Sequence, residues 1–132
     1  MKPIAVIQGI VMPGKRIGRT LGVPTANLPL PDSRPRNGVY VARVLLPDDN
    51  NRAEEAVLSQ GFHPTVPEGA PTVEVFLLNR QEDLYDRPIT VEYLHYIRPE
   101  IKFDSREDMR QQMLRDIQFS RDWFRDQAAG KT

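Results

Sequence analysis

Hydrophobic and polar residues alternate over several short segments of the chain, a pattern typical of half-buried β-strands. The segments predicted as strands are residues 4–11, 38–46, 54–61, 71–79 and 89–97. Within 38–46 the alternation slips once, and Val39, Val41 and Val44 are predicted to share one face. Such short segments, separated by turns, favour a fold that is mainly β.

The pattern changes after Phe103 to the three- and four-residue spacing of an amphipathic helix. Ser105 followed by Asp108 resembles a capping box, with Asp in place of the more usual Glu or Gln. The apolar stripe consists of Met109, Met113, Ile117, Ser120 and Phe124. Charged residues, with Asp116 and Asp122 among them, are predicted on the exposed face. Strands followed by one helix predict an antiparallel barrel or sandwich with the helix packed against it.

Prolines at positions 24, 29 and 31 restrict the segment GRTLGVPTANLPLP, residues 18–31. Because proline lacks a backbone N–H and restrains the residue before it, neither a helix nor a central strand is expected there. The chain has no internal repeat and no linker long enough to divide it. Residues 1–132 are therefore predicted to form a single domain.

Composition excludes several classes of partner and site. The 18 basic and 18 acidic side chains balance, which argues against nucleic acid or an anionic membrane as the main partner. The chain has no cysteine, so disulfides and thiolate metal sites are excluded. No signal peptide or membrane-spanning stretch is recognisable, and we expect a cytoplasmic monomer.

A glycine-rich basic loop precedes the prolines. It contains Gly14, Gly18 and Gly22 and, between them, Lys15, Arg16 and Arg19. Glycines that turn backbone N–H groups toward an anion, together with cations, suit a phosphate. A solvent-exposed basic loop explains the same residues, and composition alone does not decide between the two.

Thr25 and Asn27 offer neutral oxygens directly after this loop. Mg²⁺ prefers oxygen ligands and often takes the rest from water and substrate phosphates, so the pair is a candidate metal position. Taken alone, the pair is better explained by turn chemistry, in which both side chains bond nearby backbone.

Glu74 lies in the middle of an apolar strand, where a buried carboxylate is costly unless it is paired or faces a cavity. It is therefore either on a solvent-exposed face or in a pocket, and Glu92 is placed comparably. The pattern does not separate these alternatives. His63 and His95 have no partner at ligand spacing, so a zinc site is not expected.

Taken together, the motifs resemble the riboflavin kinase (flavokinase) family. The resemblance rests, in order, on GKRIGRTLGVPTANLPLP, NGVYVARV, PTVEVFLLN and DLYDRPITVEYLHYIRPEIKFDS, followed by the helix. It implies a six-stranded antiparallel Greek-key barrel with a C-terminal α-helix. It also implies transfer of the ATP γ-phosphoryl group to the ribityl 5′-hydroxyl of riboflavin, which gives FMN and ADP and uses Mg²⁺.

The resemblance also implies roles for individual residues. Thr25 and Asn27 would hold Mg²⁺, and Glu74 would be the general base for the ribityl hydroxyl. The ATP phosphates would be bound by Gly14, Lys15, Arg16, Gly18, Arg19 and Thr25. The residues predicted to contact the flavin are Val23, Phe103 and Trp123.

A few positions depart from the family's usual residues. Ser59-Gln60 stands where the family usually has Asn-Ile, Val23 where an aromatic residue is common, and Asp86 where a turn glycine is usual. An alternative is therefore a flavin- or nucleotide-binding module of the same fold with weakened catalysis. The sequence fits a whole protein or an excised domain equally well; a whole protein should make FMN and not FAD.

Overall fold

The computed structural model describes residues 2–13, 22, 24–62 and 71–130. Six strands form one antiparallel sheet: β1 (Ala5–Ile10), β2 (Ala26–Pro29), β3 (Gly38–Leu46), β4 (Arg52–Gly61), β5 (Thr72–Leu77) and β6 (Pro88–Arg98). A short 3-10 helix, η1 (Pro47–Asp49), follows β3, and the long helix α2 (Arg106–Ala128) follows β6.

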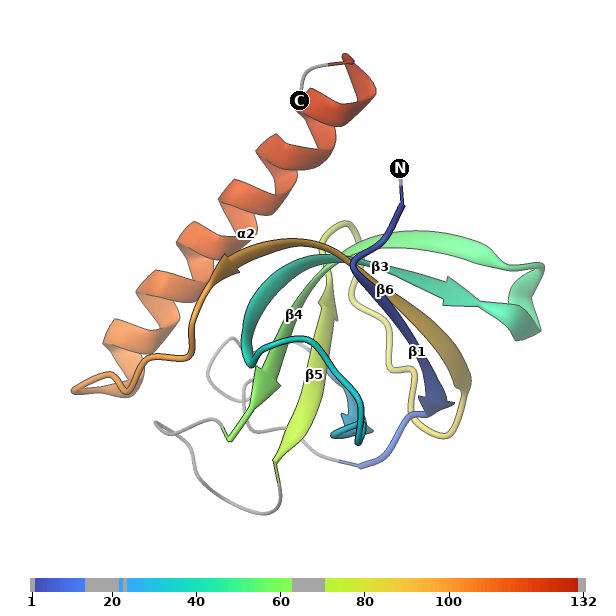
Figure 1. Ribbon diagram of the computed structural model, residues 1–132, viewed down its shortest axis with the longest axis horizontal. Helices are drawn as coiled ribbons and strands as arrows, with labels where there is room; N and C mark the ends of the chain where they lie inside the picture. Colours follow the sequence, from blue (N-terminus) through green and yellow to red (C-terminus); the bar gives the residue numbers. More distant parts are fainter. Residues whose placement is uncertain (1, 14–21, 23, 63–70, 131–132) are drawn as a thin grey trace.

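The sheet has the strand order β1-β6-β3-β4-β5-β2 and curls until its two edges approach each other (Figure 1). Met12, just after β1, bridges to Asn27 of β2, and its backbone N–H donates to the Asn27 carbonyl at 2.8 Å. β3, β4 and β5 are consecutive neighbours, and β6 returns to lie beside β3, which is a Greek-key connection. The predicted six-stranded antiparallel Greek-key barrel with a C-terminal helix is confirmed, and the barrel is nearly closed.

β2 lies in the proline-rich segment, where alternation alone predicted no strand. The proline argument excluded a central strand, and β2 stands at one end of the sheet order. An edge strand tolerates proline because part of its backbone needs no partner in the ladder. Pro29 is the last residue of this short strand.

Side chains from one face of the strands fill the interior of the barrel. The inner core includes Leu28, Tyr40, Ala42, Val44, Leu58, Val73, Val75, Ile89, Val91 and Tyr93. Val44 thus shares a face with Tyr40 and Ala42, and the prediction that placed it with Val39 and Val41 is wrong. Most of β3 is buried on both faces, so polarity does not mark which face is which.

A buried polar group, Gln60, lies within this interior and has no exposed surface. Its side-chain oxygen accepts a hydrogen bond from the Tyr93 hydroxyl at 2.6 Å. Its side-chain nitrogen donates to the Pro35 carbonyl at 2.8 Å and to Asn37 Oδ1 at 3.2 Å. Burial raises the pKa of Tyr93 above its ordinary value, so the hydroxyl keeps the proton that it donates.

α2 packs against the outer face of the barrel (Figure 1). The outer core comprises Val39, Val41, Val57, Phe76, Leu78, Leu94, Met109, Met113 and Phe124. The Ser105 hydroxyl accepts the backbone N–H of Asp108 at 3.0 Å, which confirms the predicted helix start. Within the described residues, no helix is both long enough and apolar enough to cross a membrane.

Asp116 lies on the buried side of α2, and its predicted place on the exposed face is wrong. Its side chain is 2% exposed and pairs with Arg98, with 2.8 Å between Nη2 and Oδ2. Position 116 is three residues after Met113 and four before Ser120, so it lies on the buried stripe itself. The prediction relied on the charge of Asp116, and its buried partner could not be known from the sequence.

Charged residues cluster where β4 begins. Glu82 pairs with Arg52 at 3.0 Å and with Arg87 at 2.6 Å, and Arg87 also pairs with Asp48 at 3.0 Å. Burial alone would raise the pKa of Glu82, but the hydrogen bonds from both arginines outweigh it and lower that pKa from its ordinary value. The hydrogen bond from Arg87 likewise lowers the pKa of Asp48 from its ordinary value. These carboxylates are therefore more acidic in the folded chain than in the unfolded one.

Candidate active site

Three polar residues form a row across β2, β5 and β4. Asn27 is paired in register with Glu74, and Glu74 with Ser59. Directly opposed residues project to the same side of a sheet, and the neighbours of Glu74, Val73 and Val75, point into the barrel. The row therefore lies on the outer face of the barrel, the face that α2 partly covers.

Burial answers the question that the sequence left open for Glu74. The side chain is 0% exposed, with Asn27 at 2% and Ser59 at 8%. Glu92, the comparable mid-strand glutamate, is half-buried and its Oε1 lies 3.4 Å from Arg43 Nη1. Glu74 is therefore buried beside Asn27 and Ser59, whereas Glu92 is partly exposed.

Thr25 directly precedes β2, and the environment of its side-chain hydroxyl is unusual. Its Oγ1 is buried and has no hydrogen-bond partner in the described part of the chain. A buried hydroxyl without a partner is costly, and a bound cation would satisfy it. Hydroxyl and amide oxygens are the donors that Mg²⁺ accepts, so Thr25 and Asn27 fit such an ion.

The described residues contain no group of three His, Cys, Asp or Glu side chains arranged to hold a metal. A metal at Thr25 and Asn27 would therefore take most of its ligands from water and from a phosphate-bearing substrate. The remaining predicted phosphate and flavin contacts Gly14, Lys15, Arg16, Gly18, Arg19 and Val23 lie outside the described residues.

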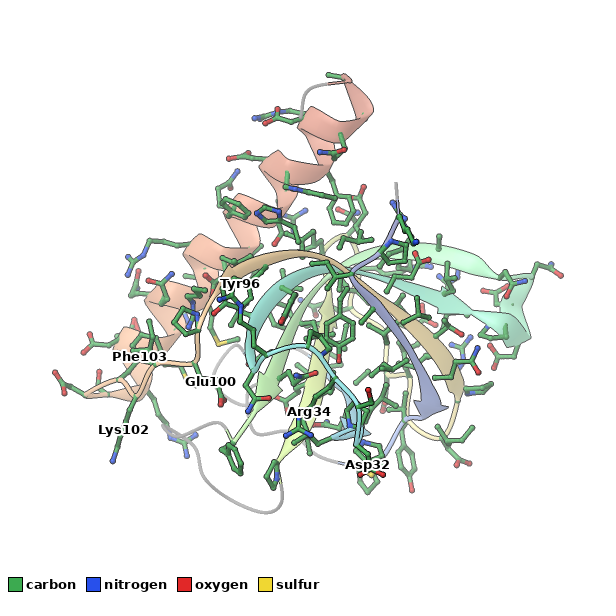
Figure 2. The ribbon with its side chains drawn as sticks, in the orientation of Figure 1. Asp32, Arg34, Tyr96, Glu100, Lys102 and Phe103 are labelled. Atoms are coloured by element: carbon green, nitrogen blue, oxygen red, sulfur yellow. The ribbon has the colours of Figure 1, made fainter. Side chains whose placement is uncertain are left out.

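A cavity of about 470 Å³ lies beside the first turns of α2. It is lined by Lys102, Phe103, Asp104, Asp108, Gln111 and Arg115. Figure 2 shows Lys102 and Phe103 on the segment between β6 and α2, next to the start of the helix, with Glu100 close by. One of the predicted flavin contacts, Phe103, is therefore part of a cavity wall.

Trp123, predicted with Phe103 as a flavin contact, lies near the other end of α2. Its ring centroid is 5.9 Å from that of His95 and 5.2 Å from that of Phe124. With a rise of 1.5 Å per residue, Trp123 is about 27 Å along the helix from Ser105. The structure does not bring Trp123 and Phe103 together.

A second cavity, of about 330 Å³, lies between β5 and α2. Its walls include Pro24, Phe76, Leu78, Asn79, Ile117 and Arg121. Phe76 follows Glu74 on the same face of β5, and Leu78, just after the strand, belongs to the same outer core. Pro24 directly precedes Thr25. The two cavities and the polar row thus all lie on the side of the barrel that carries α2.

The end of β4 is tied to the segment that leads into α2. The backbone N–H of Phe62 donates to Glu100 Oε1 at 3.0 Å. Gly61 has φ +139°, and a Cβ there would lie 2.1 Å from the same oxygen. Because glycine alone fits this backbone and this space, Gly61 is required for the contact that holds the two segments together.

The family model described as Flavokinase, riboflavin kinase, matches residues 2–124. The chain belongs to the riboflavin kinase family. This match confirms the resemblance found in the sequence motifs.

Relatives from the riboflavin kinase family are similar in sequence over most of this chain. A bifunctional riboflavin kinase/FMN adenylyltransferase from Haemophilus influenzae is 34% identical over 93% of this chain and 39% of its own length. A Bacillus subtilis protein named RNA-binding riboflavin kinase RibR is 37% identical over 86% of this chain and 49% of its own length. The chain thus spans less than half of either relative.

A solved structure supports the fold independently. The crystal structure of riboflavin kinase from Trypanosoma brucei superposes with a TM-score of 0.62 at 24% identity, over 91% of this chain and 76% of that one. At this identity the likeness concerns the fold alone, and it agrees with a six-stranded barrel carrying one helix.

Sequence reasoning missed two residues of this region. Ser59 was noted only as a departure from the family, and its place opposite Glu74 depends on the register between β4 and β5. Asp116 was assigned to the wrong face of the helix. A signal for Asp116 did exist, since its spacing from Met113 and Ser120 fits the buried stripe.

Proposed function

We propose that this chain transfers the γ-phosphoryl group of ATP to the ribityl 5′-hydroxyl of riboflavin, giving FMN and ADP. The observation that supports this most directly is Glu74, a carboxylate with 0% exposure, in register with Asn27 on the outer face of the barrel. Family membership supplies the reaction class, and the chain's own residues supply the roles below.

Glu74 acts as the general base. Its carboxylate accepts the proton of the ribityl hydroxyl as that oxygen attacks the γ-phosphorus, and the bond to the ADP oxygen breaks. A base within hydrogen-bond reach typically accelerates such a step by about 10²–10⁴-fold. Enclosure of Glu74 excludes water, which would otherwise compete with the hydroxyl as the nucleophile.

Thr25 and Asn27 are the residues proposed to hold Mg²⁺. The buried and unpartnered Thr25 Oγ1 and the buried Asn27 side chain support this role. The ion would neutralise charge on the phosphate oxygens. Gly14, Lys15, Arg16, Gly18 and Arg19 remain proposed phosphate contacts on the ground of their composition and of the family resemblance.

The two cavities suggest where the flat ends of the substrates bind. We assign the isoalloxazine ring to the cavity of about 470 Å³ that includes Phe103, and the adenine to the cavity of about 330 Å³ beside Pro24. Both volumes lie in the range of about 300–1,000 Å³ that is typical of ligand pockets; Phe103 is the aromatic side chain in the first cavity, whose other lining residues are polar or charged. Val23 remains a proposed flavin contact, whereas the position of Trp123 near the far end of α2 gives that role no support.

The proposal names two small molecules as partners and no nucleic acid. The balance of basic and acidic side chains supports this, and the RNA binding in the name of one relative is not transferred to this chain. A monomer is proposed, since nothing in the mechanism above needs a second copy.

The test is to incubate the protein with riboflavin, ATP and Mg²⁺ and to measure FMN by chromatography. Glu74→Gln should lower turnover by about 10²–10⁴-fold while flavin binding persists. Glu92→Gln is the matched control, because this glutamate also lies in mid-strand but pairs with Arg43, and its turnover should match that of the wild type. Tight binding of flavin by folded protein without FMN formation would favour a module with weakened catalysis.

A further inference from the structure

A buried ion pair joins the last residue of β6 to the middle of α2. Arg98 Nε lies 3.1 Å from each carboxylate oxygen of Asp116, and Nη2 lies 2.8 Å from Oδ2. Gln112 adds a hydrogen bond to Oδ1 at 3.1 Å. The side chains of Arg98 and Asp116 are 13% and 2% exposed, so water screens this pair little.

The guanidinium of Arg98 also faces the segment that forms the cavity wall. Its Nη1 donates to the Pro99 carbonyl at 3.1 Å. Its central carbon lies 5.7 Å from the centroid of the Phe103 ring, within the range of a cation–π contact. One side chain therefore links the helix, the first peptide after β6 and an aromatic wall of the cavity.

Stability alone does not account for this pair. Taking two charges out of water is costly, and replacing a buried pair by apolar residues of similar size is often neutral or stabilising. Met113 belongs to the outer core on the same face of α2, and Ile117 packs against that core. What an apolar pair would not provide is a fixed guanidinium plane against Phe103.

We propose that Asp116 and Arg98 are positioning residues for the flavin. Asp116 orients Arg98, and Arg98 holds Phe103 and the Pro99 peptide so that the cavity has its shape before riboflavin binds. Such preorganisation spares the substrate the cost of ordering the wall. The inference rests on the proposed function, because it assigns the isoalloxazine ring to the cavity that includes Phe103.

The inference predicts a selective effect on one substrate. In Asp116→Asn and Arg98→Lys, the KM for riboflavin should rise about tenfold, because an unrestrained wall must be ordered on binding. The KM for ATP should stay within about twofold and kcat should change little, because Glu74, Thr25 and Asn27 lie on other elements. A purely structural role would instead alter all three parameters or none of them.

The experiment measures both KM values and the riboflavin dissociation constant, the latter by quenching of flavin fluorescence. Asp122→Asn is the matched control, because Asp122 is an exposed aspartate of the same helix that accepts from Gln118 at 2.9 Å. If a single variant fails to fold, the double variant Arg98→Met/Asp116→Leu replaces the pair by apolar side chains. It should fold and still bind riboflavin about tenfold more weakly.

The inference is overturned if folded variants bind riboflavin as tightly as the wild type, or if the KM for ATP rises as much as that for riboflavin. Failure of the proposed function has a different signature, because wild-type protein would then form no FMN. In that case the riboflavin dissociation constants of the same variants still decide whether Asp116 and Arg98 shape the cavity.

Discussion

The Gln60 network inside the barrel allows a quantitative test of the structure. The perturbations are Gln60→Ile, which introduces the residue usual in the family, Tyr93→Phe, and the two combined. Gln60→Ile removes the partner of the Tyr93 hydroxyl, at a position with no exposed surface, and the partner of the Pro35 carbonyl, which belongs to a partly buried residue. Each buried polar group left unpaired costs about 1–3 kcal/mol, and the added apolar burial offsets part of this.

The expected loss of stability is therefore about 2–4 kcal/mol for Gln60→Ile. It is about 1–2 kcal/mol for Tyr93→Phe, which leaves the Gln60 oxygen without its donor. The double variant no longer contains either partner of the 2.6 Å hydrogen bond. It should therefore be more stable than the sum of the single changes predicts, by about 1–2 kcal/mol.

The assay is urea-induced unfolding, followed by circular dichroism, with the free energy of unfolding extrapolated to water. Additive effects, to within about 0.5 kcal/mol, would refute the idea that Gln60 and Tyr93 act as a pair. Because both residues face the barrel interior, away from the row that holds Glu74, the KM for riboflavin should stay unchanged in every folded variant.

Two further predictions concern a turn and the charged cluster at the start of β4. Asp86 has φ +65°, a backbone region that costs a residue with a side chain about 1 kcal/mol. Asp86→Gly should therefore raise the free energy of unfolding by about that amount. A thermal melt with an unchanged or lower midpoint would contradict this. Since the pKa values of Glu82 and Asp48 are lowered in the folded chain, the stability from these pairs is complete above the ordinary carboxylate pKa and is lost as the pH falls through the lowered folded values. Glu82→Gln should therefore flatten the acid side of a plot of stability against pH, and equal slopes in both proteins would contradict the assignment.

Much of the fold could be predicted because the alternation of residues along a strand shows which side chains share a face. Val73, Val75 and Leu77 do face the inner core, while Phe76 and Leu78 face the helix. The alternation pattern did not predict β2, because this strand has only four residues and its place at the sheet edge depends on tertiary pairing. The inner and outer faces of β3 could not be assigned from the sequence, because both are buried and so do not differ in polarity.

The site could be predicted only in part, for a related reason. Sequence pattern identified Glu74 and Asn27 as polar residues in unusual places, but their pairing depends on the register of β2 against β5. The role of Asp116 depends on Arg98, which is distant in sequence and reaches it only once α2 has packed. The separation of Phe103 and Trp123 could be inferred from the sequence, because several turns of the predicted helix lie between them.

The alternation of faces along β5 has a consequence for how this chain misfolds. The valines next to Glu74 face an interior lined by Leu28 and Leu58. A slip of one residue would turn the carboxylate into that apolar interior and place a valine beside Asn27 and Ser59. Such a chain would lose stability and activity in the same event.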